Sequence, residues 1–163
     1  MTVLGGAMRR YALESKIESP DTQVLAVHCS DHRFQGALRE FLDQTLGLKA
    51  NYDLLVVPGG PQCLAETSHL PKFAWASRKW FRFLIEAHSL QRVILIAHQD
   101  CGWYKWLAEY EAHSARGLPA RERQERDLGR VRDFLAADFP RLSVETYYAG
   151  WNGAGQVGIE AVP

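Results

Sequence analysis

The stretch RVILIAHQDCG, residues 92–102, decides the fold class. Its apolar run, Val93–Ala97, has no polar residue on either face, which predicts a short strand buried on both sides. The run ends abruptly in His98, two polar residues and Cys101. An imidazole and a thiol three residues apart are by themselves only weak evidence of a metal site. A buried structural cysteine that happens to follow a histidine gives the same sequence pattern. The rest of the chain has to supply the missing ligands.

Other parts of the chain alternate strand patterns with helix patterns. The sequence predicts strands at 23–29, 52–57, 143–151 and 155–163, and helices at 34–47, 68–90, 103–113 and 121–139. This alternation predicts an α/β fold, a three-layer sandwich whose mostly parallel sheet is covered by helices on both faces. The pair Asn152-Gly153 is a hairpin signal, so the last strand is expected to return antiparallel.

Length and composition indicate one ordinary globular domain. The chain has 163 residues, and we expect an N-terminal arm at 1–20 followed by a single domain at 21–163. Lysine plus arginine and aspartate plus glutamate both number 19, which argues against a nucleic-acid partner. The sequence shows neither a stretch long enough to cross a membrane nor a secretory signal, and its three cysteines make a poor disulfide framework. A cytoplasmic protein is therefore expected.

Two polar clusters follow two of the predicted parallel strands. CSDHR begins with Cys29, and HQDCG contains His98 and Cys101. Because the carboxyl ends of parallel strands meet at one edge of a sheet, the two thiols and the imidazole are expected to converge. Three such ligands with a fourth position open are typical of a catalytic zinc site. Asp31 is expected either to bind the metal as its fourth ligand or to be held off it by Arg33 in a forked pair.

CSDHR and HQDCG resemble the two signature motifs of the β-class carbonic anhydrases, and the resemblance extends from about residue 23 to the end of the chain. It implies a sheet of order 2-1-3-4 with an added antiparallel fifth strand. It also implies one zinc ion per chain, bound by Cys29, His98 and Cys101, with Asp31 and Arg33 as the catalytic pair. The implied reaction is reversible hydration of carbon dioxide to bicarbonate by a zinc-bound hydroxide. The implied assembly is a homodimer or a dimer of dimers with active sites at the subunit boundary.

The sequence departs from that family at the rim of the expected pocket. Pro58–Pro61 replaces a polar stretch, and the bulky residues Trp103, Tyr104 and Trp106 stand where the family has smaller ones. These rings could narrow the pocket, make it more apolar or pack in the core, and core packing is expected. The backbone N–H groups of Gly59 and Gly60 could face an anion. The more apolar rim keeps two alternatives open. One is a hydrolase of carbonyl sulfide or carbon disulfide on the same zinc site, and the other is a non-catalytic zinc- or bicarbonate-binding protein.

Further residues near the two motifs receive structural interpretations. His28 and His32 flank the expected site, and packing or hydrogen bonding is expected of them in preference to proton relay. Cys63, just past the second strand, is expected to be a structural thiol. The helix at 68–90 is expected to be capped by Ser68 and to contact both the sheet and a partner subunit. Its inward face is predicted to contain Phe73, Trp80, Leu84 and Ala87.

Overall fold

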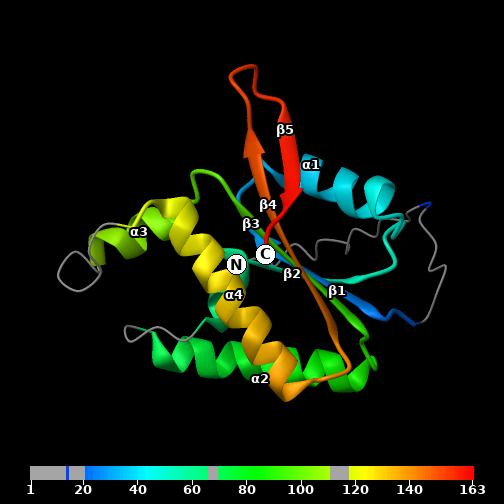
Figure 1. The fold of residues 1–163 in the computed structure, drawn as a ribbon. Helices are drawn as coiled ribbons and strands as arrows, with labels where there is room; N and C mark the ends of the chain where they lie inside the picture. Colours follow the sequence, from blue (N-terminus) through cyan, green and yellow to red (C-terminus); the bar gives the residue numbers. More distant parts are fainter. Residues whose placement is uncertain (1–13, 15–20, 66–69, 111–117) are drawn as a thin grey trace, which may run out of the picture.

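The computed structural model describes residue 14 and residues 21–65, 70–110 and 118–163 (Figure 1). The arm expected at 1–20, apart from Glu14, and the cap expected at Ser68 lie outside these residues, as does the end of the helix expected at 103–113. The chain forms one five-stranded sheet of order β2-β1-β3-β4-β5. Its strands are β1 Val24–Cys29, β2 Asp53–Val57, β3 Arg92–His98, β4 Ser143–Trp151 and β5 Val157–Ala161.

The predicted α/β fold and strand order are confirmed. β1 pairs in parallel with β2 and β3, and β3 pairs in parallel with β4. β5 returns antiparallel to β4, through a turn in which the Asn152 side chain accepts the N–H bonds of Ala154 and Gln156 at 3.0 Å each. The neighbouring inner strands β1 and β3 are almost wholly buried, which explains their unbroken apolar runs.

Helices cover both faces of the sheet, as the three-layer prediction requires (Figure 1). On one face α2, Pro71–Ala87, and α4, Ala120–Asp138, bury their apolar sides against Leu25, Val27 and Leu95. The other face is covered by α1, Gln35–Glu40, which continues as one turn of π-helix through Phe41–Thr45. The remaining helices, a 3-10 helix at Gly60–Leu64 (η2) and α3 at Gly102–Tyr110, follow β2 and β3 directly.

The predicted inward face of α2 is correct in part: Phe73 and Leu84 are partly buried against the core, while Trp80 and Ala87 are exposed. Its fully buried residues are Ala74, Ser77, Phe81 and Ile85. Trp80, predicted to point inward, is 52% exposed, and it joins Trp75 and Phe83 on the outer side of the helix. The helix carries apolar residues on several faces, so periodicity alone does not select the one that meets the sheet. Pro71 does occupy the first turn, as expected.

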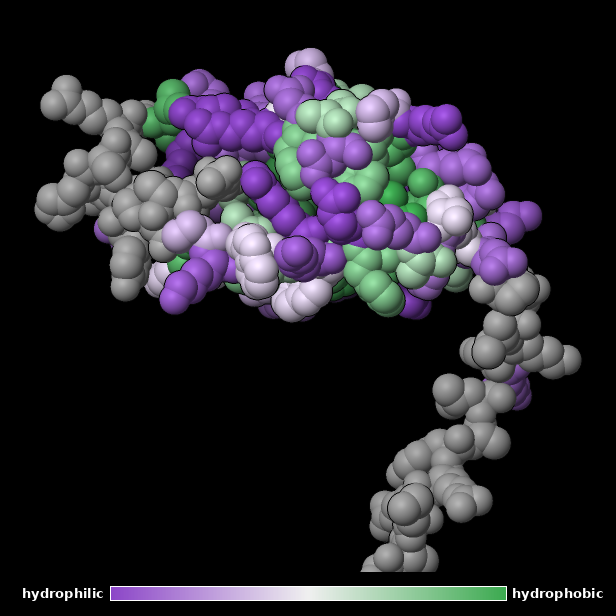
Figure 2. Space-filling model, turned by 90° about the horizontal axis from the view of Figure 1, so that it is seen from below, coloured by the Kyte–Doolittle hydropathy of each residue, from purple (hydrophilic) through white to green (hydrophobic). Residues whose placement is uncertain are grey.

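The outer side of α2 belongs to the surface shown in Figure 2, where apolar patches lie among hydrophilic ones. Trp75 and Phe83 are each 65% exposed, which is unusual for large aromatic side chains.

Within the described residues, no helix has both the length and the apolar character that a membrane crossing demands.

Candidate metal centre

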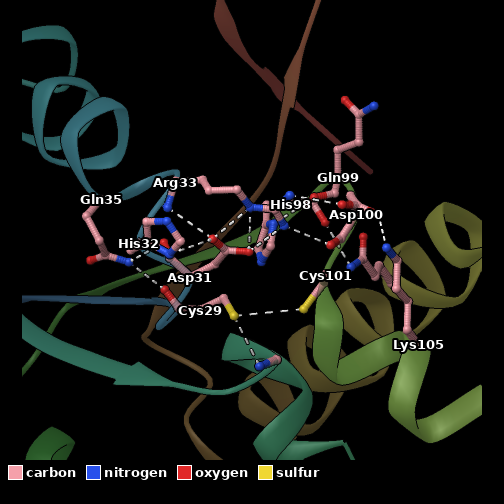
Figure 3. Close-up of polar contacts among 12 residues, drawn as sticks. Cys29, Asp31, His32, Arg33, Gln35, His98, Gln99, Asp100, Cys101 and Lys105 are labelled. Atoms are coloured by element: carbon pink, nitrogen blue, oxygen red, sulfur yellow. Dashed lines mark hydrogen bonds and ion pairs between the residues drawn. The ribbon is translucent and has the colours of Figure 1, made fainter. Parts of the chain in front are cut away.

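Three potential metal ligands meet at the carboxyl edge of the sheet (Figure 3). Cys29 ends β1, His98 ends β3, and Cys101 lies just before α3. All three are buried, and their ligand atoms lie within 4.8 Å of one another. The two sulfur atoms are 3.8 Å apart, too far for a disulfide. Two thiolates on one tetrahedral zinc, each with a Zn–S bond of about 2.3 Å, would lie about 3.8 Å apart.

His98 presents a buried nitrogen that has no partner among the described residues. Its Nδ1 lies 2.8 Å from the backbone carbonyl of Gln99, which it reaches as a donor. This contact sets the tautomer and leaves Nε2 as an acceptor without a hydrogen bond. An unsatisfied buried polar atom costs about 1–3 kcal/mol, so the site favours any cation that binds it. A metal-binding histidine usually donates its other ring N–H to a carbonyl or carboxylate oxygen, as Nδ1 of His98 does to the Gln99 carbonyl.

The two cysteine sulfurs share a hydrogen bond that separates their acidities. A hydrogen bond from Cys101 lowers the pKa of Cys29 to about 4 against the opposing effect of burial, and the N–H groups of Asp31 and Gly59 assist. The same contact raises the pKa of the Cys101 thiol. The Gly59 N–H donates to the Cys29 sulfur at 3.3 Å. One negative charge is therefore already stabilised here, and a divalent cation would favour the second thiolate. The donor set fits zinc.

Asp31 lies in the fork of Arg33, on the turn that follows β1. Arg33 Nε donates to both carboxylate oxygens at 3.0 and 3.2 Å, and its Nη2 donates to Oδ2 at 2.7 Å. The backbone N–H of Arg33 adds a bond of 3.0 Å to Oδ1. These contacts lower the pKa of Asp31 to about 2. Of the two arrangements expected for this carboxylate, the structure therefore contains the forked pair.

A shallow pocket of about 430 Å³ connects this region to the surface. The turn at Ser30–Arg33 supplies its polar lining, while Pro58, Gly102 and Trp103 supply its apolar lining. Of the three potential ligands, Cys29 reaches the pocket wall. A small molecule in the pocket would therefore meet the Asp31–Arg33 pair, one sulfur ligand and an indole ring.

The rim follows the expectations in part. Pro58–Pro61 is a tight turn that enters η2, and the Gly59 N–H faces the Cys29 sulfur. Trp103 is partly buried against Cys29, Cys101 and Tyr104, but it also lines the pocket, so its expected placement in the core is wrong in part. Its Nε1–H donates to Gln62 Oε1 at 2.8 Å.

The other rim rings divide between surface and core. Trp106 is 41% exposed and stacks on Trp103, so its core placement is wrong as well. Tyr104 is buried as expected, and its hydroxyl donates to Asp127 at 3.0 Å.

The interpretations of His28 and Cys63 agree with the structure, while the packing or hydrogen bonding expected of His32 is wrong. His28 is buried, its Nδ1 lies 2.9 Å from the Cys29 carbonyl, and burial lowers the pKa of its ring. The His32 side chain is 93% exposed at the surface, with Nδ1 4.0 Å from Asp31 Oδ1. Cys63 lies in the core between the sheet and α2, where burial raises the pKa of its thiol to about 12.

Several supporting contacts escape the sequence reasoning. Gln35 donates to the Cys29 and Asp31 carbonyls at 2.9 Å each, which holds the turn after β1. Gln124 on α4 is buried and donates to the His98 carbonyl at 3.0 Å. The sequence feature that could have identified Gln124 as buried is its lack of charge within RERQERD. The alternating charges of this run otherwise indicate a solvent-exposed helix face.

Gly59→Ala is expected to destabilise the protein and weaken its metal binding. Gly59 has φ +76°, and a Cβ there would lie 2.2 Å from the Trp103 ring. Relief of this clash would move either Trp103 or the turn whose N–H contacts the Cys29 sulfur. Gly155→Ala is the matched control, because Gly155 has φ +79° but open space around its Cβ position. Thermal unfolding should show a larger loss for Gly59→Ala, and equal losses would refute the steric argument.

Fold and site together define the class of this chain: an α/β protein with a candidate catalytic metal centre at the carboxyl edge of a parallel sheet. No known family profile matches the chain. The carbonic anhydrase of Streptococcus mutans has a similar structure, with a TM-score of 0.51 and 16% identity, over 88% of this chain and 83% of that one. At this identity the likeness shows a shared fold, the one expected from the motif resemblance.

Other similar proteins span most of the chain. The β-carbonic anhydrase CafD of Aspergillus fumigatus has a TM-score of 0.49 and 16% identity, over 90% of this chain and 92% of that one. An uncharacterized protein of Rickettsia conorii is 26% identical over 139 residues, 82% of this chain and 70% of the relative. An uncharacterized protein of Rickettsia bellii is 25% identical over 133 residues, 82% of this chain and 79% of the relative.

Proposed function

We propose that this protein is a zinc enzyme that catalyses the reversible hydration of carbon dioxide to bicarbonate. One observation carries the proposal: two sulfurs 3.8 Å apart and the unpartnered Nε2 of His98 converge beside a carboxylate held in an arginine fork. Cys29, His98 and Cys101 would hold one zinc ion per chain. The shared fold with carbonic anhydrase structures supports the proposal.

The ligand set explains the choice of metal. Thiolate and imidazole ligands in a tetrahedral arrangement suit zinc better than magnesium or calcium, which prefer oxygen. Three protein ligands leave one position for a water molecule. Zinc in such a site lowers the pKa of that water toward neutrality and so supplies a nucleophile for carbon dioxide.

Asp31 and Arg33 would provide the orientation that the reaction needs. With a pKa of about 2, Asp31 stays ionised at neutral pH and acts only as a hydrogen-bond acceptor. Arg33 binds both of its carboxylate oxygens, which keeps Asp31 from becoming a fourth metal ligand. The carboxylate can then accept a hydrogen bond from the attacking group and hold it toward the substrate carbon.

A homodimer, or a dimer of dimers, is part of the proposal. The exposed rings of Trp75, Trp80 and Phe83 on α2 support it, because aromatic side chains are enriched in protein interfaces. The three cysteines are free, which supports a reducing compartment and hence a cytoplasmic location.

A second candidate function is hydrolysis of carbonyl sulfide or carbon disulfide on the same site. The observation that favours it is the apolar lining of Pro58 and Trp103 beside the Asp31–Arg33 pair. Sulfur atoms interact favourably with aromatic rings, and these substrates are linear relatives of carbon dioxide. Carbonyl sulfide and water would yield carbon dioxide and hydrogen sulfide.

Stopped-flow measurement of carbon dioxide hydration by zinc-loaded protein tests the proposal. Activity should rise from neutral to moderately alkaline pH as the nucleophile deprotonates. Asp31 should add no inflection there, because its pKa of about 2 lies far below this range. Hydrogen sulfide release in place of carbon dioxide hydration would favour the second candidate. Neither activity at full zinc occupancy would refute both enzymes and leave a non-catalytic binding protein.

A further inference from the structure

Arg33 binds more than Asp31. Its Nη1 donates to Asp100 Oδ2 at 2.9 Å, and its Nη2 donates to the Asp100 backbone carbonyl at 3.1 Å. The guanidinium therefore joins two separate turns, the one after β1 and the one after β3 (Figure 3). Nε and Nη2 donate to the Asp31 carboxylate, while Nη1 donates to the Asp100 carboxylate, so one guanidinium binds two carboxylates.

Asp100 is itself held in place from two directions. Lys105, on the first turns of α3, forms an ion pair with Oδ1 of Asp100. The Asp100 backbone has φ +59°, a left-handed conformation that aspartate and asparagine tolerate better than most residues. Asp31, Arg33, Asp100 and Lys105 thus form a row of alternating charges, which we call the charged clasp.

The clasp bridges the two segments that carry the potential metal ligands. Cys29 belongs to the first segment, while His98 and Cys101 flank Asp100 in the second. A tetrahedral site requires these segments to keep their separation within a few tenths of an ångström. The pairing of β1 with β3 aligns the segments as far as His28 and Ile96. Beyond that ladder the two sulfurs share one hydrogen bond, and the two bonds from Arg33 to Asp100 add a direct link between the turns.

We propose that Asp100 is a positioning residue for the metal centre. It binds no ligand atom, and it acts by fixing Arg33 so that the two ligand-bearing turns are already placed for the ion. The inference rests on the zinc site of the proposed function, but not on its substrate. Loss of an outer partner of this kind typically lowers metal affinity or activity about 10- to 100-fold.

Zinc affinity, measured by competition with a chromophoric chelator, provides a test without turnover. Asp100→Gly tolerates φ +59° and removes the carboxylate, so the zinc dissociation constant should rise at least about 10-fold. Asp100→Asn also tolerates the backbone and keeps an oxygen for Arg33, so its loss should be smaller. Ala50→Gly is the matched control, because Ala50 has φ +61° and lies in an exposed turn before β2. It should leave zinc affinity unchanged.

A double-mutant cycle separates positioning through Arg33 from simple attraction of the cation by a negative charge. The cycle combines Arg33→Met with Asp100→Gly, in an Asp31→Asn background that prevents the released carboxylate from becoming a ligand. If Asp100 acts through Arg33, Asp100→Gly should cost little once Arg33 is gone. Additive losses, or a zinc dissociation constant for Asp100→Gly equal to that of the wild type, would overturn the inference.

The two proposals fail in different ways. A wild-type protein that binds zinc but hydrates no carbon dioxide would refute the proposed activity, while the dissociation constants would still decide the role of Asp100. An active enzyme whose Asp100→Gly variant binds zinc as tightly as the wild type would refute the positioning role alone. A wild-type protein that binds no zinc would overturn both. The unfolding temperature of the metal-free Asp100 variants should stay close to that of the wild type, since the Arg33–Asp100 pair is exposed to solvent.

Discussion

Cys101→Ser is expected to abolish stoichiometric zinc binding. The Cys101 sulfur lies 3.8 Å from that of Cys29, and with His98 these residues complete the three-ligand set. A serine hydroxyl does not ionise near neutral pH and is a poor zinc ligand. The loss should exceed the roughly 10- to 100-fold expected for an outer partner such as Asp100. Metal analysis of protein purified with added zinc measures the effect directly.

Cys63→Ala is the control for Cys101→Ser. Both cysteines are buried, but the Cys63 thiol lies in the core between the sheet and α2, away from the ligand cluster. Removal of this sulfur should reduce stability through a small cavity and leave the zinc content at one per chain. A Cys101→Ser protein that retains zinc at the level of Cys63→Ala would show that Cys101 is not a ligand.

Asp31→Asn is expected to retain zinc and to lose carbon dioxide hydration. The carboxylate is an acceptor held by Arg33, and it is not among the three clustered ligands. The asparagine amide is neutral and carries N–H donors, so it loses the charge-assisted pair with Arg33 and one acceptor atom. Groups that orient or exchange protons in this way typically contribute 10²–10⁴-fold, so kcat/KM should fall by about that factor. Stopped-flow assays at matched zinc content measure it.

His32→Asn supplies the comparison for Asp31→Asn. His32 adjoins Asp31 in the chain and lines the same pocket, but its side chain is 93% exposed. Its replacement should lower kcat/KM far less than Asp31→Asn does, because the His32 ring lies in solvent and 4.0 Å from the Asp31 carboxylate. Similar losses in the two variants would assign the effect to a general disturbance of the turn. Full activity in Asp31→Asn would remove the carboxylate from the mechanism.

Local sequence was sufficient for the strands, while the order of the sheet was expected from the resemblance of the two motifs to those of the β-class carbonic anhydrases. The runs VLAV and VILIA are apolar on both faces, and β1 and β3 are buried on both faces as that pattern predicts. The run LLVV predicts the same for β2, but this is wrong: β2 is an edge strand, and Leu54 and Val56 are 49% and 37% exposed. Polar clusters at the ends of two such strands must meet at one edge of a parallel sheet. The sequence therefore groups Cys29, His98 and Cys101 on the condition that the first and third strands are neighbours, as β1 and β3 are.

Other features depend on which surfaces meet in three dimensions. Trp103 lines the pocket because Gly59 and Gln62, some forty residues earlier in the chain, provide the space and the acceptor for its ring. The inward face of α2 is selected by the sheet against which it packs, since several of its faces are apolar.

The proposed role of Asp100 likewise depends on contacts that only the tertiary structure creates. Motif spacing identified it as a polar residue between two potential ligands, but its contact with Arg33 spans 67 positions of the chain. When residues are close in sequence, or lie at the ends of neighbouring strands, their proximity in space can be predicted from the sequence pattern. Contacts between distant loops cannot be predicted in this way, because they depend on how each turn is packed once the sheet and helices have assembled.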